Sequence, residues 1–120
     1  MLNTRGIQSI HVLGVDGGGT KTTAVVLDGE AREQGRGQSG PSNIHVVGRE
    51  PAKAALAEAI HGALQAAGLS AEDVAALGLG MAGAGRPAER AEIEQMVREI
   101  GPFPRPVIVH DAEAALVGGG

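Results

Sequence analysis

The sequence predicts a mixed α/β fold in which three antiparallel strands come first and parallel strands joined by helices follow. Two apolar, β-branched runs, residues 10–15 and 22–27, flank a short glycine loop. Residues 51–67 repeat apolar side chains at helical spacing, and two further apolar runs, 74–82 and 107–109, are separated by a second helical pattern. The expected order along the chain is therefore β, β, β, α, β, α, β, α.

The first three strands follow from the short connections between them. Only the glycine loop separates Ile10–Val15 from Thr22–Leu27, so this pair is expected to form a hairpin. Asp28 and Gly29 predict a second turn, after which Ala31–Gln38 can supply a third and more polar strand.

The first long helix is expected to begin at Pro51, which suits the first helical position, and to end at Gly68. Its apolar face is predicted to contain Ala52, Leu56, Ile60, Leu64 and Ala67. Ser70 to Asp73 has the pattern of a capping box, but the apolar residues 74–82 favour a buried strand. At most one helical turn is therefore expected before that strand.

A second helix is expected after the loop Gly83–Gly85. Arg86-Pro87 marks its start and Gly101-Pro102 its end, with an apolar face made by Ile93, Met96, Val97 and Ile100. Val107–Val109 predicts one more strand, and Asp111 can cap a last helix that starts at Ala112.

Composition and charge favour a domain that binds a small solute. The 120 residues suffice for one domain, and the net charge of −4 comes without a basic stripe, so neither a nucleic acid nor a membrane is an expected partner. No apolar run approaches the roughly 20 residues of a membrane span. Residues 1–9, expected to be a flexible N-terminus, lack the pattern of a signal peptide, and the absence of cysteine fits a reducing compartment. We therefore expect a cytoplasmic protein.

The segment GVDGGGTKTT, residues 14–23, indicates an anion-binding loop. It misses the Walker A pattern because Thr20 intrudes before Lys21, and it leads into a strand rather than a helix. Glycine N–H groups and the Thr20 hydroxyl can donate to phosphate oxygens. Asp16 would repel a phosphate unless a Mg²⁺ ion lies between them. The alternative is a glycine-rich hairpin with an ordinary turn aspartate.

Four segments in order make the chain similar to a known family. GVDGGGTKTTAVVLD resembles the first phosphate motif of the actin-like ATPase and sugar kinase superfamily. GPSN (40–43), GLGMAGAGRP (78–87) and HDAEAALVGG (110–119) narrow the resemblance to the group of N-acetylglucosamine kinases, glucosamine kinases and BadF/BadG/BcrA/BcrD-type ATPases. The resemblance implies a ribonuclease-H-like lobe over residues 10–120.

The resemblance also implies roles for individual residues. Asp16 would organise Mg²⁺, and Asn43 with Ser42 corresponds to a sugar-contacting position. Asp111 corresponds to the carboxylate that orients the acceptor hydroxyl and takes its proton, a role that can coexist with capping a helix. The implied contacts to the phosphates of ATP are Gly17, Gly18, Gly19, Thr20, Lys21 and Thr22.

The family continues with a Gly-Thr-Gly-Ser phosphate motif and an adenosine-binding segment, and neither occurs before Gly120. We therefore expect an N-terminal lobe without its C-terminal partner, inactive by itself and prone to form a homodimer through exposed apolar surface. The implied function is ATP-dependent phosphorylation of an amino sugar, N-acetylglucosamine or glucosamine. Two alternatives are an ATPase activator of a 2-hydroxyacyl-CoA dehydratase or benzoyl-CoA reductase type system, and a non-catalytic sugar-binding module.

Overall fold

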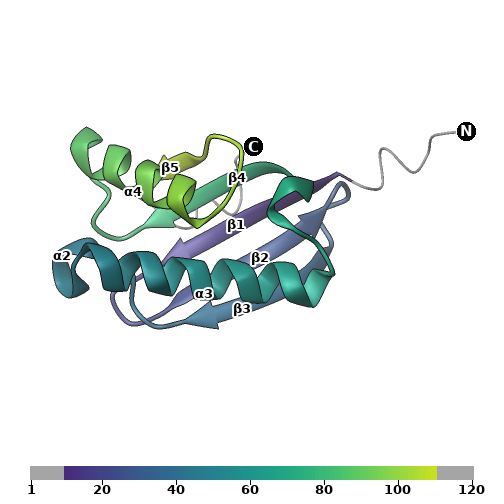
Figure 1. Cartoon of the computed structure of the whole chain (residues 1–120), viewed down its shortest axis with the longest axis horizontal. Helices are drawn as coiled ribbons and strands as arrows, with labels where there is room; N and C mark the ends of the chain where they lie inside the picture. The colour runs from purple at the N-terminus through teal and green to yellow at the C-terminus, as the bar shows by residue number, and fades with distance from the viewer. Residues whose placement is uncertain (1–9, 111–120) are drawn as a thin grey trace, which may run out of the picture.

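A computed structural model describes residues 10–110, which form a five-stranded mixed sheet with helices on one face (Figure 1). β1 pairs antiparallel with β2, as does β2 with β3, whereas β4 runs parallel to both β1 and β5. The predicted mixed sheet with an antiparallel start is therefore confirmed. In spatial order the strands are β3 (Glu33–Ser39), β2 (Thr22–Asp28), β1 (His11–Gly17), β4 (Val74–Met81) and β5 (Val107–Val109).

Two long helices, α3 (Arg49–Ala67) and α4 (Pro87–Ile100), lie next to each other over the same face of the sheet (Figure 1). Alternate residues of β1, β2 and β4 point toward them, because side chains alternate between the two faces of a strand. Aliphatic side chains from both layers form one buried cluster, which includes Leu13, Val15, Val26, Leu56, Ile60, Leu79, Ile93 and Met96.

The helix boundaries differ from the prediction at one place. A short helix, α2 (Ile44–Val47), precedes α3, and α3 begins two residues before Pro51. Four residues are too few to show a helical period, but the Asn43 side chain caps α2 by accepting a hydrogen bond from the His45 N–H at 2.9 Å. As predicted, one 3₁₀ turn (Ala71–Asp73) precedes β4. The helix expected from Ala112 and the flexible segment 1–9 lie outside the described residues.

Helix α3 packs directly against the backbone of β3. A Cβ atom at Gly37 would lie 2.1 Å from the Ala59 carbonyl oxygen, and one at Gly35 would lie 2.3 Å from the Ala63 carbonyl oxygen. No side chain at either position fits between strand and helix. The polar third strand therefore joins the core through its two buried glycines and the alanines of α3.

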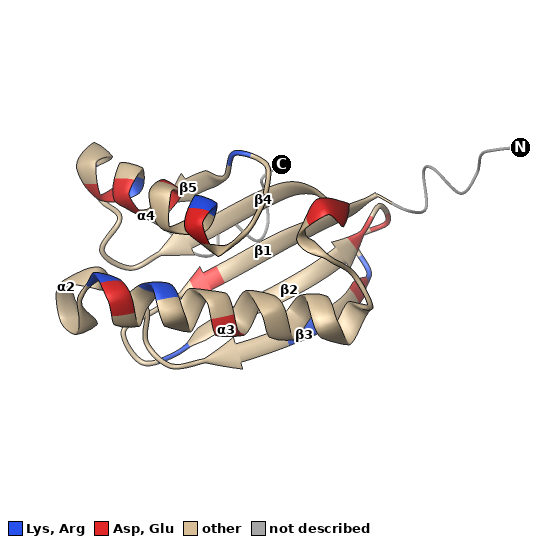
Figure 2. Ribbon diagram, in the orientation of Figure 1, with Lys and Arg blue, Asp and Glu red and all other residues tan. Residues whose placement is uncertain are grey.

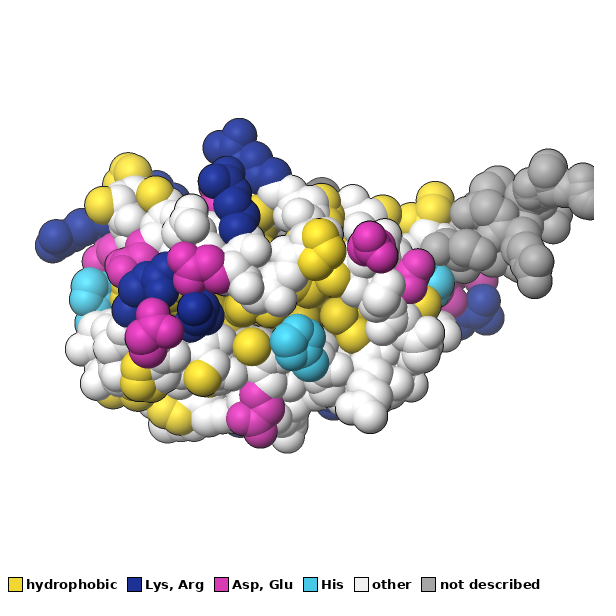
Figure 3. Space-filling model, in the orientation of Figure 1, with side chains coloured by type: hydrophobic (Ala, Val, Ile, Leu, Met, Phe, Trp, Pro, Cys, Tyr) yellow, Lys and Arg dark blue, Asp and Glu magenta, His cyan; other side chains and the backbone are white. Residues whose placement is uncertain are grey.

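An ion-pair cluster connects the first turns of α3 to α4. Glu99 accepts hydrogen bonds from Arg49 Nη2 and Lys53 Nζ, each at 2.9 Å. These contacts, that from Lys53 above all, lower the pKa of the Glu99 carboxyl to about 2. Basic and acidic segments occur on both helices in Figure 2, and Figure 3 shows such side chains gathered at one end of the helix-covered face.

Candidate functional site

The loop between β1 and β2 is closed at its base and open at its tip. The Gly18 N–H donates to the Lys21 carbonyl oxygen at 2.9 Å, so this group is used by the loop itself. Gly19, Thr20 and Lys21 are exposed, and nothing lies within 4 Å of a Cβ atom built at Gly19. Outside helices and strands, no backbone hydrogen bond within residues 10–110 uses the N–H groups of these three. They are the donors that the loop offers to an anion.

Three segments that are far apart in the sequence meet at the end of β1. The Ala82 N–H donates to the Gly17 carbonyl oxygen at 2.8 Å, and the Ser42 N–H donates to the Gly18 carbonyl oxygen at 3.1 Å. A Cβ atom at Gly17 would lie 2.5 Å from both Met81 Sδ and Ser42 Oγ. Glycine is required at position 17 because it leaves room for the Ser42 and Met81 side chains to pack against the loop.

Thr22 and Ser42 are completely buried behind this loop. Thr22 Oγ1 donates to the Gly40 carbonyl oxygen at 2.7 Å and is hydrogen-bonded to Ser42 Oγ, also at 2.7 Å. In this structure the two hydroxyls hold the loops together. Their expected direct contacts to phosphate and sugar stay predictions.

Asn43 lies against the loop that follows β4. Gly83 has a φ of +90°, and a Cβ atom there would lie 2.6 Å from Asn43 Oδ1. Because Oδ1 already accepts the His45 N–H, the group left to donate to a ligand is the Asn43 side-chain NH₂. His110, which follows β5, lies at the same edge, since its Nδ1 would be 3.8 Å from a Cβ atom at Gly85.

Asp16 is half-buried on the sheet face opposite to the helices, because its neighbours Val15 and Gly17 point toward the helix-covered core. Within the described residues no hydrogen bond or ion pair engages its carboxylate, and no group of three or more His, Cys, Asp or Glu side chains gathers to hold a metal. A single carboxylate beside a loop that is predicted to bind phosphate fits Mg²⁺, which takes one or two carboxylates together with phosphate oxygens and water. Asp111, the predicted base, lies outside the described residues.

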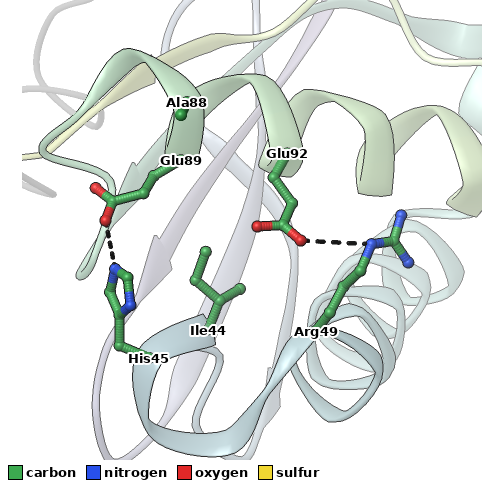
Figure 4. A pocket seen from close by; sticks show the side chains of 6 residues that line it. All are labelled: Ile44, His45, Arg49, Ala88, Glu89 and Glu92. Atoms are coloured by element: carbon green, nitrogen blue, oxygen red, sulfur yellow. Dashed lines mark hydrogen bonds and ion pairs between the residues drawn. The ribbon is translucent and has the colours of Figure 1, made fainter.

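A pocket of about 210 Å³ opens between α2, the start of α3 and α4 (Figure 4). His45 Nε2 lies 2.5 Å from Glu89 Oε2, and Arg49 Nε lies 3.7 Å from Glu92 Oε2. The hydrogen bond from the Arg86 N–H lowers the pKa of the Glu89 carboxyl, and the hydrogen bond with His45 lowers it further. Sequence reasoning missed His45 and Glu89, although the spacing of Glu89 three residues after Arg86 is that of a helix-capping glutamate. The lining residues are Ile44, His45, Arg49, Ala88, Glu89 and Glu92.

The helices of residues 10–110 include none that is both long and apolar enough to cross a membrane.

Comparison with known proteins shows that the chain is similar to part of an amino-sugar kinase. It is 38% identical over 109 residues to the N-acetylmuramic acid/N-acetylglucosamine kinase of Clostridium acetobutylicum, an alignment that covers 91% of this chain and 36% of that protein. The chain thus spans about a third of the length of this relative.

Solved structures share the fold. A ROK family glucokinase from Streptomyces griseus, in complex with glucose and AMPPNP, is 25% identical with a TM-score of 0.57, over 92% of this chain and 38% of that one. The (R)-2-hydroxyglutaryl-CoA dehydratase component A of Acidaminococcus fermentans is 17% identical with a TM-score of 0.50, over 82% of this chain and 30% of that one.

The predicted actin-like ATPase and sugar kinase fold is therefore confirmed. The sequence model of the BadF/BadG/BcrA/BcrD ATPase family matches residues 13–118, nearly the whole chain. The chain belongs to the BadF/BadG/BcrA/BcrD ATPase family.

Proposed function

We propose that the protein carrying this chain is a cytoplasmic kinase that transfers the γ-phosphoryl group of ATP to an amino sugar, N-acetylglucosamine or glucosamine. The observation that carries the proposal is the meeting of the glycine loop, Asn43 and the Gly83 segment at one edge of the sheet. The naming of the Clostridium acetobutylicum relative supports this choice of sugars. Ligands of open α/β sheets commonly bind at the carboxyl ends of the strands, where β1 and β4 both end here.

The glycine loop is proposed to form the phosphate half of the site. The N–H groups of the exposed residues Gly19, Thr20 and Lys21 donate to phosphate oxygens, and the Lys21 ammonium adds a positive charge. Asp16 holds Mg²⁺, which when bound neutralises charge on the phosphates during transfer. The buried Thr22 hydroxyl stabilises the base of the loop.

The second half of the site is proposed to hold the sugar. The Asn43 side-chain NH₂ donates to a sugar oxygen, and the carboxylate of Asp111, which follows the end of β5, accepts the proton of the attacking hydroxyl. The new bond joins this hydroxyl oxygen to the γ-phosphorus, and ADP leaves with the electrons of the broken bond. Because such transition states are loose, the protein contributes mainly positioning and charge stabilisation.

A coupled assay of ADP release tests the proposal, with N-acetylglucosamine, glucosamine, glucose and no sugar as four parallel reactions. Asp111→Ala should lower kcat by about 10²- to 10⁴-fold and leave ATP affinity nearly intact, as expected for loss of a general base. Glu58→Ala, an exposed carboxylate on α3, is the matched control and should match the unmodified protein.

Each other outcome has a distinct meaning. ADP release that does not depend on sugar favours the ATPase activator, and sugar binding without turnover favours the non-catalytic module. An unchanged kcat for Asp111→Ala would remove that residue from the reaction.

A further inference from the structure

A single carboxylate joins the two segments that meet at the sugar side of the proposed site. Glu89 Oε1 accepts a hydrogen bond from the Arg86 N–H at 2.9 Å, which caps the start of α4. Its other oxygen, Oε2, lies 2.5 Å from Nε2 of His45 on α2, as the dashed line in Figure 4 marks. The Glu89 side chain is 15% exposed, whereas that of His45 is 57% exposed, so the contact lies at the surface with its carboxylate partner largely covered by protein.

His45 continues this connection to Asn43. Its ring binds Glu89, and its backbone N–H donates to Asn43 Oδ1 at 2.9 Å. Gly83 lies in the loop before α4, the helix whose start Glu89 caps, and a Cβ atom at Gly83 would lie 2.6 Å from the same Oδ1. The Asn43 amide is therefore held between two elements that Glu89 ties together.

Helix α2 depends on such contacts. It has four residues, none of them buried, and a helix this short is not stable by itself. Ile44 and Val47 pack partly against the core, but neither reaches α4 through a hydrogen bond. The hydrogen bond between His45 and Glu89 is thus the directional contact that fixes the orientation of α2 relative to α4. Asn43, which caps α2, is oriented with it.

We propose that Glu89, acting through His45, is a positioning residue that orients the Asn43 side-chain NH₂ toward the sugar. The inference rests on the proposed function and extends it to two residues outside the motifs. Neither residue needs to touch the sugar. Loss of the link should weaken sugar binding and leave the phosphate half of the site unchanged, because the glycine loop contacts Ser42 and Ala82 rather than α2.

Steady-state kinetics of the protein that carries this chain test the proposal, with the amino sugar that the unmodified protein phosphorylates. His45→Ala and Glu89→Gln should each raise the KM for the sugar about tenfold, the factor of one weakened hydrogen bond. The KM for ATP should not change, and kcat should fall less than the sugar KM rises. His45→Gln, which keeps an N–H donor in reach of Glu89, should restore much of the affinity.

Two further variants make the test specific. Glu92→Gln is the matched control, because Glu92 lines the same pocket on α4 but pairs with Arg49 and not with α2. The double variant of His45→Ala with Glu89→Gln should be no worse than His45→Ala alone, since the alanine already removes the link that the glutamine weakens. If His45→Ala raises the sugar KM and Glu89→Gln does not, His45 acts by itself and the proposal is overturned.

Hydrogen exchange supplies a readout that is independent of activity. In Glu89→Gln the backbone amide of residue 45, which donates to Asn43, should exchange about tenfold faster, while the amides of β1 keep their rates. Unchanged exchange at residue 45 overturns the proposal. If the unmodified protein phosphorylates no sugar, the proposed kinase function fails, and this exchange experiment still decides whether Glu89 orients Asn43.

Discussion

Replacing Gly83 with alanine should damage the sugar side of the site in two ways. A side chain at positive φ places Cβ against the backbone and costs about 1–2 kcal/mol. At the observed φ of +90° the new Cβ would also lie 2.6 Å from Asn43 Oδ1, so the Asn43 side chain must move and give up its cap of α2. Loss of an asparagine cap costs about 1 kcal/mol. Together Gly83→Ala should lower the free energy of unfolding by about 2–3 kcal/mol.

Urea denaturation measures this change, and Gly85→Ala is the matched control in the same loop. Gly85 does not have positive φ, and the nearest atom to its Cβ would be His110 Nδ1 at 3.8 Å, an ordinary contact. The control should change stability by less than about 0.5 kcal/mol. In the kinase assay Gly83→Ala should raise the KM for the sugar and not the KM for ATP. Equal effects of the two substitutions on stability and on sugar KM would refute the inferred contact between Gly83 and Asn43.

Three other substitutions have expected outcomes. Gly37→Ala should destabilise the protein by about 3 kcal/mol or more in urea denaturation, because its Cβ would lie 2.1 Å from the Ala59 carbonyl oxygen. Gly40→Ala is the control, because nothing lies within 4 Å of a Cβ atom at Gly40. Equal midpoints of the two variants would contradict the close packing of α3 against β3. Thr22→Val keeps the shape of the side chain but removes the hydroxyl that is hydrogen-bonded to the buried Ser42 Oγ. The same measurement should show a loss of about 1–3 kcal/mol, and an unchanged midpoint would show that the hydroxyl contributes nothing to stability. The pKa of Glu99 is lowered from 4.5 to about 2, so its contribution to stability is complete above pH 4.5 and is lost as the pH falls toward 2. Glu99→Gln should therefore make the free energy of unfolding less dependent on pH across this range. Identical pH profiles of the variant and the unmodified protein would contradict the ion pairing.

Local patterns in the sequence predict most elements of this fold because each pattern has one dominant physical cause. The β-branched run at 22–27 and the helical spacing from Ala52 to Ala67 both became the expected elements. The short helix at 44–47 could not be predicted from periodicity, because four residues make about one turn and no apolar spacing can repeat within it. Its start was signalled only by the capping residue Asn43.

Motifs in the sequence predicted where a candidate site would lie, but they could not predict the tertiary contacts within it. The glycine loop was identified from Gly17 to Gly19, and its exposed tip agrees with an anion-binding function. The burial of Thr22 and Ser42 was not predicted, since a hydroxyl beside a loop can face either solvent or protein. The contact between His45 and Glu89 joins residues 44 positions apart, so no local spacing could have indicated it.

The packing of α3 against β3 determines how this edge strand is aligned with the helix. Gly35 and Gly37 are two residues apart, which spans about 6.6 Å along a strand, and their contacts Ala63 and Ala59 are four residues apart, which spans about 6 Å along a helix. The two spacings match, so both glycines fit at once. If the strand slipped by one residue, Arg36 would have to occupy the place of a glycine, where no side chain has room. The alignment of this edge strand, which has no large apolar side chain, is thus set by the positions at which glycine alone fits against the helix.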